Sequence, residues 1–203
     1  MSISGIICGL GNPGRQYALT RHNAGFMVID RLMESAEKIP GEQVRLKNET
    51  LDHLLWEWTT RFPSGKWLLV KPMSFMNRSG AGLAKVYQQS MIHSSQLLVI
   101  HDEVDLPLGR LRIKSGGGLA GHKGLASIAQ HLGTRDFVRL RFGVGRPESG
   151  IDLSRYVLDK FMPHEKELRD EVLARAVLTV RAFCHGGADN AREELSRFPS
   201  LLK

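Results

Sequence analysis

The stretch Gly9-Leu10-Gly11-Asn12-Pro13-Gly14 decides how the chain begins to fold, because an apolar run from Ile3 to Leu10 leads directly into it. A run of this length that ends at turn residues is typical of one buried strand. Apolar residues at helical spacing begin at Phe26, and Thr20 is placed to cap that helix. The stretch therefore predicts a strand, a loop and a helix, with Asn12 on the loop at the carboxyl end of the strand.

A histidine, His22, stands where this helix is expected to begin, in the run Arg21-His22-Asn23-Ala24-Gly25. The partial positive charge at a helix N-terminus disfavours an imidazolium, so the position favours a neutral ring that can accept a proton. His22 is therefore a candidate base. A histidine that merely lies on the surface is the alternative.

The same glycines match the G-x-G-x-x-G pattern of dinucleotide-binding sites. Pro13, however, lies in the turn whose N–H groups would face a pyrophosphate, and proline has none. The expected helix does not begin at Gly14, and the acidic residues that follow, Asp30 and Glu34, fall inside that helix rather than after a second strand. A nicotinamide-dependent oxidoreductase is thus the weakest functional hypothesis.

The composition is that of one globular domain, with 203 residues, 42% hydrophobic and 24% charged. Lys and Arg total 28 against 21 Asp and Glu, and the resulting charge of +7 favours a polyanionic partner. Cys8 and Cys184 are too few for a disulfide framework. No run resembles a signal peptide or reaches membrane-spanning length, so we expect a cytoplasmic protein without membrane contact.

Strands and helices alternate along the rest of the chain. Expected strands cover 43–47, 51–59, 66–71, 97–100, 110–114 and 139–142, and expected helices cover 81–89, 125–132 and the region from about 163, interrupted at 185–187. Alternation of this kind predicts an α/β fold. We expect one domain over residues 1–203, with a twisted, mixed but largely parallel sheet flanked by helices on both faces, on which the C-terminal helices pack.

Polar side chains follow three of the expected strands at their carboxyl ends. Asn12, Asn77 and Asp102 each come just after such a strand. Because open α/β sheets bind ligands at this edge, the three segments predict a site there.

Cations alternate with apolar residues on two expected strands. Arg110, Arg112 and Lys114 fall on one face of the first, and Arg139 and Arg141 on one face of the second. The pattern predicts a basic patch; a merely solvated sheet face is the alternative. The glycine-rich segment between these strands, Ser115 to Gly124, is typical of a phosphate-binding loop or a lid, although it lacks the G-K-[ST] ending of a P-loop and a flexible connection is the alternative.

Five segments together resemble the bacterial-type peptidyl-tRNA hydrolase family. They are Gly9-Leu10-Gly11-Asn12-Pro13-Gly14, Thr20-Arg21-His22-Asn23-Ala24-Gly25, Phe75-Met76-Asn77-Arg78-Ser79-Gly80, His101-Asp102-Glu103-Val104-Asp105-Leu106-Pro107 and Arg139-Leu140-Arg141-Phe142-Gly143-Val144-Gly145. They occur in that family's order. The resemblance implies a monomeric enzyme of translation and ribosome rescue that uses no metal or other cofactor. Its implied partner is peptidyl-tRNA, bound at the acceptor end and the 5′-phosphate, whose peptide ester it hydrolyses.

The resemblance also implies residue roles. His22 is the implied base that activates water, and Asp102 the carboxylate that orients it. The implied substrate-binding residues are Asn12, Tyr17, Met76, Asn77 and Lys123, and the implied tRNA phosphate clamp is Lys114 and Arg141, with Arg112 and Arg139 on the same strand faces.

One segment departs from the family pattern. Where the family usually has G-H-N-G, this chain has Gly121-His122-Lys123-Gly124, and Leu119 is also unusual in that loop. A lysine can stabilise negative charge, but as a flexible point charge rather than a neutral amide. The departure keeps open a second hypothesis, an RNA-binding member without turnover that is similar to the organellar intron-splicing factors derived from this family.

Overall fold

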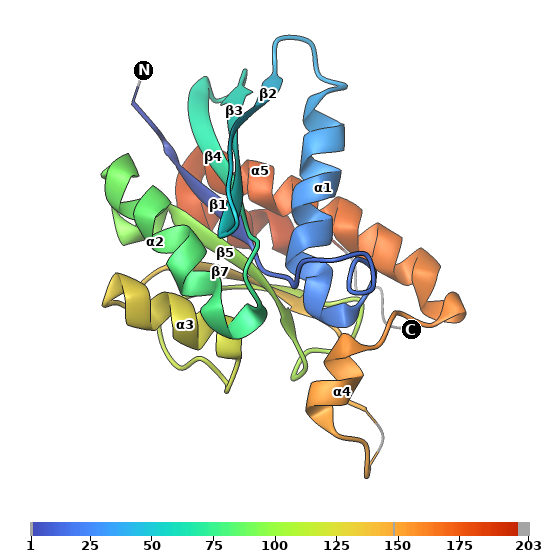
Figure 1. Ribbon diagram of the computed structural model, residues 1–203. Helices are drawn as coiled ribbons and strands as arrows, with labels where there is room; N and C mark the ends of the chain where they lie inside the picture. Colours follow the sequence, from blue (N-terminus) through green and yellow to red (C-terminus); the bar gives the residue numbers. More distant parts are fainter. Residues whose placement is uncertain (1, 148, 199–203) are drawn as a thin grey trace.

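The centre of the molecule is a sheet with the strand order β2-β3-β4-β1-β5-β7-β6, seen in a computed structural model that describes residues 2–147 and 149–198 (Figure 1). Residues 1, 148 and 199–203 of the expected domain lie outside this description. The strands are β1 (Gly5–Gly9), β2 (Gln43–Glu49), β3 (His53–Thr60), β4 (Gly65–Pro72), β5 (Leu97–Glu103), β6 (Leu111–Ser115) and β7 (Val138–Gly143).

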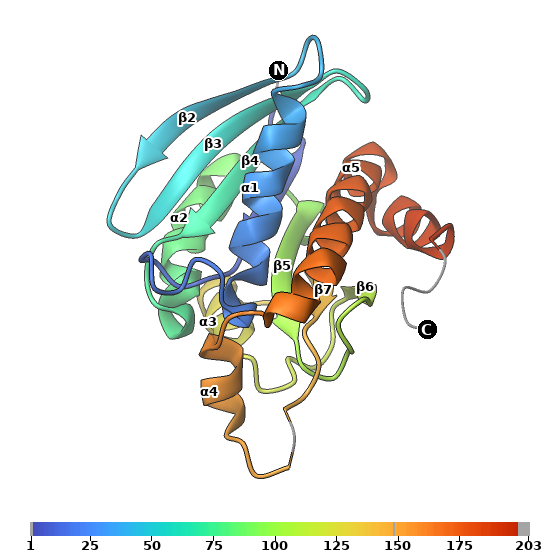
Figure 2. The same cartoon turned by 90° about the vertical axis from the view of Figure 1, so that its right-hand side faces the viewer.

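Helices cover both faces of this sheet, as Figures 1 and 2 show. Helices α1 (Ala24–Ala36) and α5 (Lys166–Ser196) pack on one face, and α2 (Ser79–Ser90) and α3 (Lys123–Leu132) on the other. A short helix, α4 (Leu153–Leu158), projects near the edge where β5 and β7 end. Three-residue 3-10 turns complete the described elements: η1 (Arg21–Asn23), η2 (Met76–Arg78), η3 (Ser94–Gln96) and η4 (Pro163–Glu165).

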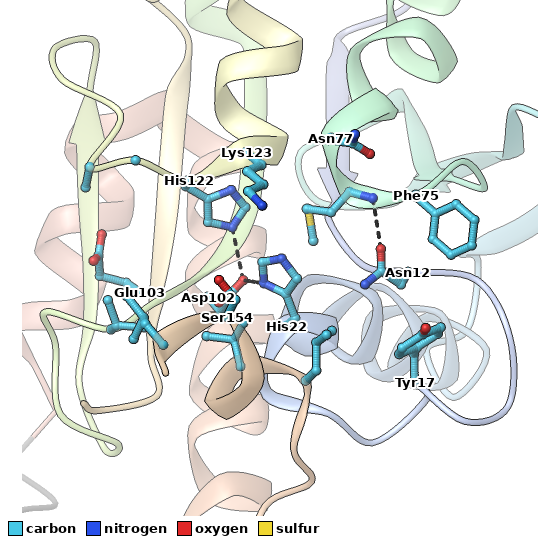
Figure 3. A pocket seen from close by; sticks show the side chains of 17 residues that line it. Asn12, Tyr17, His22, Phe75, Asn77, Asp102, Glu103, His122, Lys123 and Ser154 are labelled. Carbon is cyan, nitrogen blue, oxygen red and sulfur yellow. Dashed lines mark hydrogen bonds and ion pairs between the residues drawn. The ribbon is translucent and has the colours of Figure 1, made fainter. Parts of the chain in front are cut away.

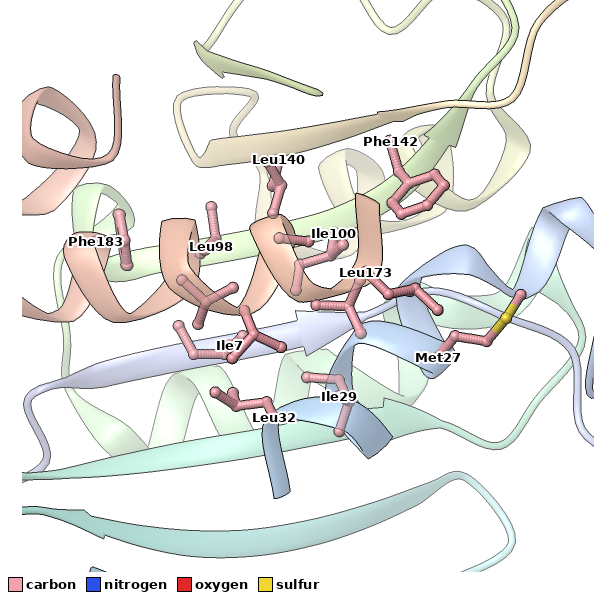
Figure 4. Packing of buried hydrophobic residues seen from close by; sticks show 14 of the residues in the cluster. Ile7, Met27, Ile29, Leu32, Leu98, Ile100, Leu140, Phe142, Leu173 and Phe183 are labelled. Atoms are coloured by element: carbon pink, nitrogen blue, oxygen red, sulfur yellow. The ribbon is translucent and has the colours of Figure 1, made fainter. Parts of the chain in front are cut away.

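The alternation of side chains along each central strand supplies both cores. In β1, Ile7 joins the cluster beneath α1 and α5, drawn in Figure 4, whereas Ile6 and Cys8 join the cluster beneath α2 and α3. Successive residues of a strand point to opposite faces, so a strand covered on both sides must be apolar at every position. This double burial explains why the run from Ile6 to Leu10 contains no polar residue.

The sheet is mixed and largely parallel, which confirms the predicted fold class. β1 pairs in parallel with β4 and β5, and β5 pairs in parallel with β7. β3 runs antiparallel to β2 and β4, and β6 antiparallel to β7, so only these two of the described strands oppose the rest. The carboxyl ends of β1, β4, β5 and β7 therefore meet at one edge.

Two local expectations were wrong. The helix after β1 begins at Ala24, and the Thr20 side chain donates to the Tyr17 carbonyl instead of capping it. His22 thus lies in the turn η1 before the helix, not in its first turn. Strand β5 continues to Glu103, which places Asp102 inside the strand. Helix α4 was not predicted, because six residues are too few to show a helical period.

Helix α5 is interrupted where the sequence predicted a break. Gly186 and Gly187 have non-helical backbone angles, and the φ of +70° at Gly187 is one that side-chain-bearing residues rarely adopt. The chain resumes a helix that ends at Ser196, as expected for a short final helix. Despite the 31 residues of α5, the described chain contains no helix with the length and apolar character needed to cross a bilayer.

Candidate active site

A pocket of about 430 Å³ opens at the edge where the parallel strands end. Its walls come from the loop after β1, from η1 and η2, from the end of β5, from the start of α3 and from α4 (Figure 3). The lining residues are Asn12, Tyr17, His22, Phe75, Met76, Asn77, Asp102, Glu103, Val104, Ala120, Gly121, His122, Lys123, Leu153, Ser154, Val157 and Leu158. The sheet edge predicted from the sequence therefore brings together Asn12, Tyr17, His22, Met76, Asn77, Asp102 and Lys123.

Asp102 is the buried centre of this pocket, and one of its oxygens serves two histidines. Its Oδ1 lies 2.8 Å from His22 Nδ1 and 3.0 Å from His122 Nε2, and the carboxylate side chain is only 2% exposed. His22 arrives from the α1 side of the sheet, whereas His122 arrives from the start of α3 on the other side. A carboxylate at the very edge of the sheet can be reached from both layers.

The turn that carries His22 lies beside Asp102 because the backbone at the start of α1 closely approaches the backbones of β1 and β5. A side chain at Gly25 would lie 2.4 Å from the Ile100 carbonyl oxygen, and one at Gly9 would lie 2.3 Å from the Gly25 carbonyl oxygen. The start of α1 therefore rests directly on β1 and β5, which only glycine allows. His22, three residues earlier, is held beside Asp102 as a result.

The hydrogen bonds assign the proton positions of both rings. His122 is the N-cap of α3, and its Nδ1 accepts from the backbone N–H groups of Gly124 and Leu125. The His122 proton must then be on Nε2, which donates to Asp102. His22 donates to the same oxygen from Nδ1, so its Nε2 carries a free lone pair. His22 is therefore arranged to accept a proton.

Electrostatics keep Asp102 ionised in this surrounding. Burial by itself raises the pKa of the carboxyl, but the adjacent His22 and His122 rings and their hydrogen bonds outweigh it and hold the pKa well below its ordinary value. The neighbouring His101 is neutral, because burial lowers its pKa to about 3, and its ring meets His122 edge-on at 5.0 Å. The cluster thus contains one buried negative charge that accepts N–H groups from two histidines.

His22, Asp102 and His122 also form the kind of donor set that can hold a metal ion, since one ligand atom from each lies within 4.8 Å of the others. A metal on His122 Nε2 would displace the proton that donates to Asp102. The ring would then need that proton on Nδ1, where it would break the cap on α3. The hydrogen-bond pattern fits a proton-transfer site better than a metal site.

Asn12 faces the pocket with its amide in a fixed orientation. Its Oδ1 accepts from the Met76 backbone N–H at 2.8 Å, so its Nδ2 is the end that faces the cavity (Figure 3). The backbone N–H and carbonyl of Asn12 are bound by the Asn23 side chain, at 2.9 and 3.0 Å. An N–H that a pyrophosphate would need is thus already engaged, which further weakens the dinucleotide hypothesis.

Lys123 is the first residue of α3, and its exposed side chain is drawn toward His22 in Figure 3. Within the described part of the chain it has no ion-pair partner. Asn77 and Phe75 lie on the opposite wall of the pocket with Tyr17 below them, and Met76 is buried beneath. An anionic group that enters the pocket would find Lys123 unpaired.

The predicted basic strand face exists, but it lies outside the pocket. Arg112 stands opposite Arg141 and Lys114 opposite Arg139 in the antiparallel register, so all four share one face. Arg112 and Lys114 have no ion-pair partner within the described residues, while Arg141 Nε donates to Glu103 at 2.9 Å.

Arg139 requires a correction, because its side chain is not free to bind an external anion. The residue is 2% exposed, and its guanidinium donates to the carbonyl oxygens of Gly116 and Gly118. Arg139 therefore anchors the glycine-rich loop instead of presenting a charge on the strand face. The alternation of residues along β7 predicted the face on which Arg139 lies, but it could not predict that the glycine-rich loop covers this side chain.

His122 is the important residue that sequence reasoning left without a role. A histidine next to a glycine-rich loop and just before an expected helix is a candidate N-cap, and that was the available signal. Its bond to Asp102 depends on the packing of α3 beside β5 and could not be read from spacing.

Known proteins are similar to this chain over nearly its whole length. The family model for peptidyl-tRNA hydrolase matches residues 6–200. A peptidyl-tRNA hydrolase of Nitratidesulfovibrio vulgaris is 43% identical over 199 residues, which cover 98% of this chain and 99% of that protein. One from Aquifex aeolicus is 37% identical over 193 residues, covering 95% and 96%.

Solved structures agree with these relatives. The crystal structure of a peptidyl-tRNA hydrolase from Acinetobacter baumannii is similar, with a TM-score of 0.85 and 32% sequence identity. The match covers 98% of this chain and 99% of that one. The similarity thus extends over the sheet, its helices and the edge that carries the pocket.

Proposed function

The chain belongs to the peptidyl-tRNA hydrolase family and is an enzyme of that class, and we propose that it cleaves the ester between a peptide or N-blocked amino acid and the 3′ end of tRNA, with His22 as the base. Water is the nucleophile. The products are the free peptide and a tRNA that can return to translation.

In this mechanism, His22 Nε2 takes a proton from a water molecule as that water attacks the ester carbonyl. Asp102 holds the ring by accepting from Nδ1 and stabilises the imidazolium that forms. His122 donates to the same oxygen, so the carboxylate cannot rotate away when His22 is charged. The imidazolium then returns its proton to the departing ribose oxygen.

Attack on the carbonyl creates an oxyanion that needs donors. Asn12 Nδ2 is arranged to supply one, because its amide oxygen is already bound by Met76 N–H. Lys123 supplies a positive charge from the opposite wall. Asn77 and Tyr17 contact the substrate on the η2 side of the pocket, over a floor formed by Met76.

The 5′-phosphate of tRNA binds to the strand face formed by Lys114, Arg141 and Arg112. Like charges opposite one another in a sheet are unfavourable, and a bound phosphate would relieve that repulsion. The buried carboxylate of Glu103 holds the Arg141 guanidinium in place for this contact.

The proposal also covers the oligomeric state, the use of a metal and the cellular compartment. We expect a monomer, as the family resemblance implies. The proton positions on His122 support a reaction without a metal. Two buried free thiols, Cys8 and Cys184, support a reducing compartment such as the cytoplasm.

The observation that carries the proposal is the His22–Asp102–His122 arrangement at the pocket edge. Its test is turnover of N-blocked aminoacyl-tRNA by the purified protein and by His22→Ala. We expect the variant to lose turnover while it keeps its fold, because Asp102 retains its bond to His122, and its affinity for tRNA, because the basic strand face lies outside the pocket.

Equal activity of the two proteins would overturn the mechanism. Binding of tRNA by both proteins with turnover by neither would instead support the second hypothesis, an RNA-binding member without catalysis.

A further inference from the structure

The residue before the proposed base, Arg21, is buried and bound to a distant segment of the chain. Its side chain is 4% exposed. One guanidinium nitrogen donates to the Lys160 carbonyl at 2.6 Å, and the other donates to Glu165 Oε2 at 2.7 Å. The backbone N–H of Arg21 donates to the Asp159 carbonyl at 3.1 Å. A buried guanidinium is costly unless its donors are satisfied, and these bonds engage two of its three nitrogens, while Nε has no partner among the described residues.

The bound segment includes the helix that forms one wall of the pocket. Helix α4 contributes Leu153, Ser154, Val157 and Leu158 to the lining, and the Arg21 contacts begin immediately after it. The guanidinium also lies 4.4 Å from the centre of the Tyr156 ring, which is part of α4. Arg21 thus contacts α4 itself and the chain that follows it.

The helix that forms this wall depends on its contacts with the rest of the protein, because a helix of six residues is not stable alone. Val157 is buried, whereas Leu153 and Leu158 are each 40% exposed. The Tyr156 hydroxyl donates to the Val144 carbonyl at 2.8 Å and so ties the helix to the segment after β7. Arg21 and Tyr156 therefore both attach α4 and the residues after it to the rest of the protein.

We propose that Arg21 is a positioning residue that sets the width of the pocket by holding α4 against the turn that carries His22. The proposal rests on the proposed function, because the wall matters only if the substrate occupies the pocket. His22 keeps its own bond to Asp102 and does not depend on the guanidinium. Loss of Arg21 should thus disturb substrate binding more than the chemical step.

The test is steady-state hydrolysis of N-blocked aminoacyl-tRNA by Arg21→Met and Glu165→Gln. We expect KM to rise about tenfold or more for Arg21→Met, the scale of a lost charge-assisted hydrogen bond. Glu165→Gln keeps a neutral acceptor and should show a smaller rise of about two- to threefold. For both variants, kcat and the pH dependence of kcat should stay within about twofold of wild type.

A matched control separates positioning from general destabilisation. Arg181 is also a mostly buried arginine, paired with Glu42 at 2.9 Å and stacked 5.2 Å from the centre of the Trp58 ring, but it does not line the pocket. Arg181→Met should lower the melting temperature and leave KM unchanged. If Arg21→Met does not fold, Glu165→Gln decides the question.

An unchanged KM in the folded Arg21 and Glu165 variants would overturn the proposal, as would a fall in kcat alone. Activity of His22→Ala would instead overturn the proposed function, so the two failures are distinguishable.

Discussion

The pocket and the basic strand face differ in whether their charged groups have partners within the protein. In the pocket, the buried Asp102 carboxylate accepts from two histidines and its pKa is held low. On the strand face, Arg112 and Lys114 stand opposite other cations, and no carboxylate among the described residues pairs with them. The Asp102 cluster is internally satisfied, whereas the strand face presents two cations that have no acidic partner among the described residues.

This difference separates chemistry from recognition. A satisfied buried network costs no reorganisation when the reaction begins, which is the condition for efficient electrostatic catalysis. An unpaired basic surface attracts a polyanion and contributes affinity that depends on salt. Changes to the groups that bind the Asp102 carboxylate should therefore alter kcat, and changes on the strand face should alter binding.

The strongest disruption of the pocket short of removing His22 is Asp102→Asn. It removes the negative charge that would stabilise a protonated His22, while the amide oxygen of Asn can still accept from the two histidine N–H groups. We expect kcat to fall by about 10² to 10⁴, measured with saturating N-blocked aminoacyl-tRNA. Affinity for deacylated tRNA should be unchanged, and a variant with normal kcat would remove Asp102 from the mechanism.

The same variant tests the protonation of Asp102 through stability. Because the native pKa of Asp102 is lowered, the contribution of its charge to stability is complete above the unfolded pKa of about 3.9 and is lost as the pH falls toward the native pKa. The difference in unfolding free energy between wild type and Asp102→Asn should narrow as the pH falls below about 4. Urea titrations across this range measure it, and a difference that closes near neutral pH would contradict the assignment.

Asn12→Ala should have the next largest effect. It removes the Nδ2 donor and also leaves the Met76 N–H without its acceptor. We expect kcat to fall by about 10² to 10³, the scale of one lost oxyanion donor. Asn77→Ala is the matched control, because Asn77 lines the same pocket but is exposed. An equal loss for both amides would show that Asn12 only positions the substrate.

On the strand face, Lys114→Ala should weaken binding of 5′-phosphorylated peptidyl-tRNA by about 10- to 100-fold, the scale of a charge-assisted contact. Arg141→Ala should behave similarly, and both should lower the salt slope of binding by about one. Binding of a dephosphorylated substrate should hardly change. Equal losses on both substrates would show that the face acts only as a general positive field.

The smallest effect is expected at Lys123. Like Arg112 and Lys114, it has no ion-pair partner among the described residues, but it lies inside the pocket. Lys123→Asn should retain activity or raise it, whereas Lys123→Leu should lower it by roughly tenfold. In Lys123→Asn, the acid limb of the kcat/KM profile should move to higher pH, because a nearby positive charge no longer opposes protonation of the base. Full activity of Lys123→Leu with an unchanged profile would place this side chain outside the reaction.

The sequence predicted the fold class and most of the pocket for identifiable reasons. Period-2 alternation and short apolar runs locate strands, and parallel strands bring their carboxyl ends to one edge, so Asn12, Asn77 and Asp102 could be expected together. Helix α4 was missed because its six residues form no recognisable period. The wall it provides is consequently the part of the pocket that sequence reasoning could not supply.

What the sequence determined by itself is the set of local patterns: buried strands, glycines at close approaches, and cations on one side of β6 and β7. What only the tertiary structure decided is how far each polar group is already engaged. Arg139 is occupied by loop carbonyls, whereas Lys114 has no acidic partner among the described residues, although both stand at equivalent positions of paired strands. His122 reaches Asp102 only because α3 begins beside the end of β5. The reason is physical: alternation and helical period depend on the few bonds between neighbouring residues, whereas burial and hydrogen-bond partners depend on segments that are distant in sequence and meet only in the folded chain.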